Sequence, residues 1–85
     1  MFGLFKNPRI LDLCKNGELE RLRGTLYEIV SNLCEEGEFS DGRIRIYYGG
    51  EGKFWAEHTK SDEVWEIETL KDLKKFLEEI KNLER

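Results

Sequence analysis

Residues 43–69 restrict the fold of this chain most strongly, because their pattern predicts three antiparallel strands. Two turn signals divide the stretch: the glycine-rich run at 49–52 and the pair Ser61-Asp62. Between these turns, apolar and aromatic side chains alternate with polar ones, as they do in strands that bury one face. The stretch is therefore predicted to be a three-stranded meander.

The lengths of the two turns set the register of this meander. A five-residue loop pairs Tyr48 with Phe54, and a two-residue turn pairs His58 with Trp65. With this register each face of the sheet is uniform, as the two-residue period of a strand requires. The predicted core face carries Ile44, Ile46, Tyr48, Phe54, Ala56, His58, Trp65 and Ile67. The opposite face carries Arg43, Arg45, Tyr47, Trp55, Glu57, Thr59, Val64, Glu66 and Glu68.

Two helices are predicted before the meander. The first spans residues 8–15, with Asn7 as its N-cap and Asn16-Gly17 at its end. The second spans residues 18–36, because leucine, isoleucine and valine recur there at steps of three and four residues. Gly24 falls in its interior, where glycine is about 1 kcal/mol less favourable than alanine.

One more helix, over residues 70–84, follows the meander. Thr69 is its predicted N-cap, and Asp72 is placed to complete a capping box. Its apolar stripe consists of Leu70, Leu73, Phe76, Leu77, Ile80 and Leu83. The whole chain, residues 1–85, is then a single α+β domain: a two-layer sandwich in the order α-α-β-β-β-α, with the helices on one face of the sheet.

The apolar segment at residues 1–6 is expected to pack its two phenylalanines, Phe2 and Phe5, on the core of the domain. A docking or membrane-touching segment is the alternative. The segment is too short to span a bilayer, so no membrane partner is expected.

Cys14 and Cys34 are predicted to be reduced thiols. If the first two helices form a hairpin that turns at Gly17, the cysteines lie on the order of 20 Å apart, since a helix rises about 1.5 Å per residue. A disulfide needs its two Cα atoms within about 7 Å. The sequence has no signal-peptide core, so a cytoplasmic location is expected, and thiols stay reduced there.

Composition and motifs predict neither an enzyme nor a cofactor or metal site. The chain has no cysteine–histidine spacing typical of metal ligands, and His58 falls on the core face as a packed or hydrogen-bonded residue. The glycines at 49–52 lie between two strands, so they predict a hairpin tip and not a phosphate loop. The high content of charged residues, 38%, and the absence of glutamine are typical of a hyperthermophile protein.

The outer face of the predicted sheet is the leading candidate for function. Tyr47 and Trp55 lie opposite each other there, and an exposed aromatic pair beside arginine is typical of a protein interface. The predicted interface comprises Arg43, Arg45, Tyr47, Trp55, Glu57, Val64 and Glu66. We therefore expect the protein to be a small adaptor or regulator that forms a homodimer or binds a partner protein.

The alternative function is nucleic-acid binding by lysines early in the last helix, namely Lys71, Lys74 and Lys75. Such a cluster could contact phosphates. The net charge of −4 disfavours it. Two pairs along the helix, Lys74 with Glu78 and Lys75 with Glu79, provide a simpler role for two of these lysines.

Overall fold

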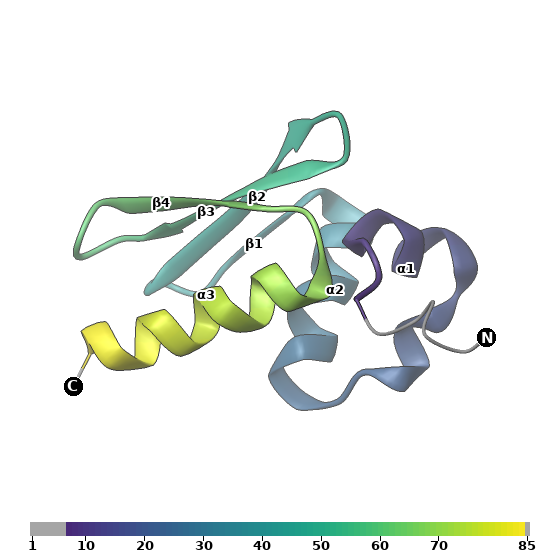
Figure 1. The fold of residues 1–85 in the computed structure, drawn as a ribbon, viewed down its shortest axis with the longest axis horizontal. Helices are drawn as coiled ribbons and strands as arrows, with labels where there is room; N and C mark the ends of the chain where they lie inside the picture. The colour runs from purple at the N-terminus through teal and green to yellow at the C-terminus, as the bar shows by residue number, and fades with distance from the viewer. Residues whose placement is uncertain (1–6, 85) are drawn as a thin grey trace.

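The computed structural model describes residues 7–84, and it is an α+β domain with the elements in the order α-α-β-β-β-β-α. The helices are α1 (Ile10–Asn16), α2 (Gly24–Glu36) and α3 (Leu70–Leu83), and a short 3-10 helix, η2 (Glu18–Arg21), precedes α2. The strands are β1 (Glu38–Ser40), β2 (Ile44–Gly50), β3 (Lys53–His58) and β4 (Glu63–Ile67). Figure 1 shows α3 running along the sheet, with α1 and α2 at the end of the molecule where the chain begins. The predicted packing of residues 1–6 lies outside the described residues.

The sheet has four strands in the order β1-β2-β3-β4, so the prediction of three strands was wrong by one. The additional strand, β1, pairs antiparallel with β2 and places Phe39 opposite Ile46. It has only three residues, and Phe39 is its one apolar side chain. A strand this short has too few residues to show the two-residue alternation by which the others were recognised.

The register between β2 and β3 is the predicted one, with Tyr48 opposite Phe54. The register between β3 and β4 differs from the prediction by two residues, because His58 pairs with Glu63 instead of Trp65. The connection is not a two-residue turn: it spans residues 59–62, with Asp62 in the left-handed region at φ 59° and its N–H donating to the His58 carbonyl. A shift of two residues leaves every side chain on its predicted face.

The inner face of the sheet and the helices share one hydrophobic core. Most residues of the predicted core face are buried in it. Tyr48 and Trp65 are the exceptions. Tyr48 is 46% exposed at the hairpin tip, where its hydroxyl oxygen accepts from the N–H of Gly52. Trp65 is half-buried and packs edge-on against Phe76 of α3, with ring centroids 5.0 Å apart.

The predicted single helix over residues 18–36 is wrong, because the chain breaks between η2 and α2. Leu22 is extended, and Gly24 has a φ of 59°, a left-handed conformation that glycine adopts without steric strain. Arg23 stabilises the break by donating to the carbonyl of Glu20 at 2.9 Å. A pattern of apolar spacing alone does not reveal such a break, since the apolar residues on both sides still face the core.

The start of α1 also differs from the prediction, because the helix begins at Ile10 and Arg9 is its N-cap. Asn7, predicted to cap this helix, instead accepts from the N–H of Lys71 in the first turn of α3. Next to it, the carbonyl of Pro8 accepts from the N–H of Leu70. The predicted end of α1 is confirmed, with Gly17 in the left-handed conformation.

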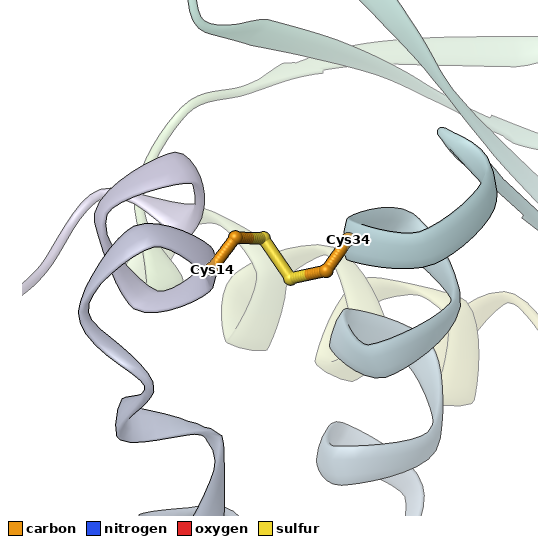
Figure 2. The surroundings of a disulfide bond; sticks show 2 residues. All are labelled: Cys14 and Cys34. Atoms are coloured by element: carbon orange, nitrogen blue, oxygen red, sulfur yellow. A yellow bond between two sulfur atoms is a disulfide. The ribbon is translucent and has the colours of Figure 1, made fainter.

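Cys14 and Cys34 form a disulfide that joins α1 to α2, so the prediction of reduced thiols was wrong (Figure 2). Their Cα atoms lie 5.5 Å apart. The predicted separation assumed one straight helix from Gly17 onward. Because the chain breaks before Gly24, α2 starts afresh and returns alongside α1, which brings the two cysteines together.

The capping box that begins α3 is confirmed. The Thr69 hydroxyl oxygen accepts from the N–H of Asp72, and the Asp72 carboxylate accepts from the N–H groups of Thr69 and Glu68. The predicted stripe supplies Leu73, Phe76 and Ile80 to the core. Over residues 7–84, no helix is long and apolar enough to cross a membrane.

Candidate interaction surface

The outer face of the sheet lies opposite the helices, and no other element of residues 7–84 covers it. Six of the seven predicted interface residues gather here. Two cross-strand rows arrange them: Tyr47–Trp55–Glu66 and Arg45–Glu57–Val64. Each row crosses β2, β3 and β4, so the six residues lie on a surface formed by three strands.

Trp55 and Val64 are the exposed apolar side chains of this surface, at 38% and 55% exposure. The Trp55 indole lies directly over Gly49, since a Cβ added to Gly49 would overlap its Nε1 and Cδ1 atoms. An aromatic ring over a glycine of the neighbouring strand covers backbone that would otherwise contact water. Gly49 therefore sets where the indole lies, while part of the ring remains exposed.

Tyr47 is held by two polar neighbours. Its hydroxyl donates to the Glu57 carboxylate at 2.9 Å, and the Arg45 guanidinium lies over its ring, 4.8 Å from the centroid. The hydrogen bond to Glu57 raises the pKa of the Tyr47 hydroxyl, because ionisation would remove the donated proton and place two negative charges side by side. These contacts fix the orientation of the aromatic ring before any partner arrives.

Lys53 is a member of this surface that the sequence prediction placed in a loop. Its ammonium group forms a salt bridge with Glu66 at 2.9 Å, across from β3 to β4. The hydrogen bond and the charge of Glu66 raise the pKa of Lys53. Lys53 could have been found from the sequence, because its position is two residues before Trp55 and so falls on the same face.

Arg43 lies apart from the other six predicted interface residues. Its guanidinium pairs with Glu84 at 2.8 Å and approaches Asp41 at 3.7 Å. Glu84 follows α3, on the side of the sheet that the helices cover. Arg43 precedes β2, so the alternation of the strand does not determine the direction of its long side chain.

His58 is buried, with 3% of its surface exposed, and both ring nitrogens have partners. Nδ1 lies 2.9 Å from the Ser61 hydroxyl, and Nε2 lies 3.4 Å from the Glu84 carboxylate. This is the hydrogen-bonded histidine that the sequence predicted. Both cysteine sulfurs are in the disulfide, so neither is a free nucleophile beside it.

The three lysines of the alternative function are all exposed on α3. The predicted lysine–glutamate pairs do not form salt bridges: within the described chain, neither Lys74–Glu78 nor Lys75–Glu79 comes within 4.0 Å. The carboxylate of Asp72 lies near Lys75, and the positive charge of Lys75 is one of the effects that lower the pKa of Asp72. One acidic group therefore lies beside the lysine cluster.

Residues 7–84 hold no cluster of three or more His, Cys, Asp or Glu side chains that could bind a metal ion. In comparisons with protein-family models, curated proteins and solved structures, nothing matches this chain.

Proposed function

We propose that this protein is a small, non-enzymatic interaction module that binds another protein through the outer face of its sheet. The observation that carries the proposal is the exposure of Trp55 and Val64 on a sheet face that no element of residues 7–84 covers. Tryptophan and tyrosine are enriched among the residues that contribute most to binding. The face also holds its aromatic side chains in fixed positions, which lowers the entropy lost on binding.

A second copy of the chain is the first partner to test. The outer face carries both signs of charge: Arg45 and Lys53 are cationic, while Glu57 and Glu66 are anionic. Away from the axis, a two-fold contact sets each residue of one copy against a different residue of the other, so a face with both signs can complement itself. A stable contact of this kind buries about 800 Å² on each partner.

Light scattering coupled to size-exclusion chromatography tests this proposal. We expect the wild-type chain to elute as a dimer at low salt, and Val64→Lys to elute as a folded monomer, because the substitution replaces the more exposed of the two apolar side chains on this face with a charge. The double variant Tyr47→Ala/Trp55→Ala is expected to behave in the same way. Tyr27→Ala is the matched control, since Tyr27 is 45% exposed but lies on α2.

A wild-type monomer at every concentration would contradict self-association, as would a Val64→Lys variant that remains dimeric. The ratio of absorbance at 260 and 280 nm, read in the same run, shows whether nucleic acid elutes with the protein and so tests the alternative function. Nucleic acid that elutes with the wild-type chain, and is lost when Lys71, Lys74 and Lys75 become glutamate, would favour nucleic-acid binding instead.

A further inference from the structure

β4 is an edge strand with one open side. It pairs with β3 and is last in the strand order, and no strand in the described chain pairs with its other side. In an antiparallel sheet, alternate N–H and C=O groups of an edge strand point away from the neighbouring strand. β4 therefore presents a row of main-chain donors and acceptors to which another extended chain can bind.

A groove runs between this open edge and α3. Its volume is about 290 Å³, and it is lined by Trp65, Glu66, Asp72, Lys75, Phe76 and Glu79. The Trp65 ring packs edge-on against Phe76 and is only half-buried, so part of its surface is open to the groove. A chain added to β4 would point every second side chain to the α3 side of the sheet, where this groove lies.

The charge around the groove is mainly negative. Asp72 and Glu79 line it from α3, and Glu63 lies on the same side of β4 as Trp65, whereas Lys75 is the lining residue with a positive charge. Glu63 and Glu79 form no salt bridge with any residue from 7 to 84. This distribution favours a cationic ligand, and it disfavours pairing of β4 with β4 of a second copy, which would bring the glutamates together.

We propose that the β4 edge binds an extended, basic segment of a partner protein by strand addition. The main chain of that segment pairs with β4, and one apolar side chain enters the groove against Trp65. Its lysine or arginine side chains lie beside Glu63 and Glu79. This surface lies on the α3 side of the sheet and shares only Glu66 with the outer face, so the proposal goes beyond the interaction module and does not depend on it.

A synthetic peptide provides the probe: a blocked octapeptide with one central phenylalanine, lysines two residues before and two residues after it, and valine at the positions between. The phenylalanine and the lysines then point to the same side of the added strand. Titration into Trp55→Phe leaves Trp65 as the only tryptophan, so its fluorescence reports directly on the groove. We expect a saturable change in that fluorescence, and slowed hydrogen exchange of the β4 amides. A peptide with glutamate in place of each lysine is expected to give neither change.

The contribution of the main chain is tested with a peptide of the same sequence whose alternate amides are N-methylated. Its charges and side chains are unchanged, but it can no longer donate hydrogen bonds to an edge strand. We expect this peptide to lose binding. Equal binding of the methylated peptide would overturn the proposal, because it would show a general attraction to an acidic surface. The absence of saturable binding by the unmodified peptide up to millimolar concentration would also overturn it.

The charged rim is tested with Glu63→Lys/Glu79→Lys, which we expect to weaken binding of the lysine peptide about tenfold, as the loss of two exposed ion pairs would. Glu78→Lys/Glu35→Lys is the matched control, because it makes the same change in net charge at two exposed helix positions that do not line the groove. An equal loss of affinity in the control would show that only net charge matters, and would contradict the groove.

Discussion

Asp72 stabilises the start of α3, and its contribution is expected to depend on pH. Burial raises the pKa of its carboxyl, but hydrogen bonds from the N–H groups of Glu68 and Thr69 outweigh this effect and hold the pKa below its ordinary value of 3.8. A group whose pKa is lowered by folding stabilises the folded state above its unfolded pKa. That contribution is lost as the pH falls through the folded pKa.

We therefore expect Asp72→Asn to lower the free energy of unfolding by about 1 kcal/mol at pH 7. The difference from wild type should be smaller at pH 3, below the ordinary pKa of 3.8, because the carboxyl of the unfolded chain then takes up a proton that the folded carboxylate binds less readily. Urea denaturation at both pH values measures it. Glu78→Gln, an exposed carboxylate on the same helix, is the control and should have little effect at either pH. A loss at pH 3 as large as that at pH 7 would contradict the role of the charge.

Single residues also mark where prediction of the candidate surface succeeded and where it failed. Alternation along β2, β3 and β4 placed six of the seven predicted interface residues on the outer face, where the structure has them, because a side chain inside a strand has only two directions available. Arg43 precedes β2 and has a long, flexible side chain, so alternation does not determine its position. Its actual partner, Glu84, is 41 residues away in sequence, and no local pattern connects the two.

At the scale of elements, the break before α2 can be tested by the effect of Gly24→Ala on stability. A continuous helix and a broken one predict effects of opposite sign. If Gly24 lay inside a continuous helix, Gly24→Ala would stabilise the protein by about 1 kcal/mol. In the structure Gly24 has a φ of 59°, a conformation that costs an L-residue roughly 1–2 kcal/mol. Apart from its chain neighbours and the nearby backbone of α2, no atom of residues 7–84 lies within 4 Å of an added Cβ, so the expected effect is backbone strain.

We therefore expect Gly24→Ala to destabilise the protein by about 1 kcal/mol. The midpoint of thermal or urea denaturation measures this change. Gly24→Asn is the matched control, because asparagine tolerates the left-handed conformation better than alanine does, and it should be less destabilising. An increase in stability for Gly24→Ala would indicate one continuous helix.

The sheet shows which properties of an element the sequence determines. The burial of one face fixes side-chain direction, and so the faces of β2, β3 and β4 were predicted correctly even though β4 is displaced by two residues. When a strand is displaced by two residues, each inward side chain takes the place of the next inward one. The pattern of burial therefore does not distinguish the two registers. The residues of the turn decide the register, and Asp62 in the left-handed conformation lengthened that turn.

At the scale of the whole molecule, the disulfide joins the two helices that follow one another at the start of the chain. A domain of 85 residues buries a smaller share of its surface than a larger one, and so gains less stability from its core. The segment between α1 and α2 includes the break at residues 22–23, where no regular hydrogen bonding holds the two helices together. The link between Cys14 and Cys34 restricts this segment in the unfolded chain as well as the folded one.

Reduction of the disulfide is therefore expected to lower the free energy of unfolding by about 3 kcal/mol, because it releases a loop closed over 20 residues. Urea denaturation with and without a phosphine reductant measures the loss. The variant Cys14→Ala/Cys34→Ala is the control: it should resemble the reduced wild type and should not respond to the reductant. Mass spectrometry of the alkylated, unreduced chain gives an independent check. Two modified cysteines, or denaturation midpoints that do not change on reduction, would show that α1 and α2 are held together by packing alone.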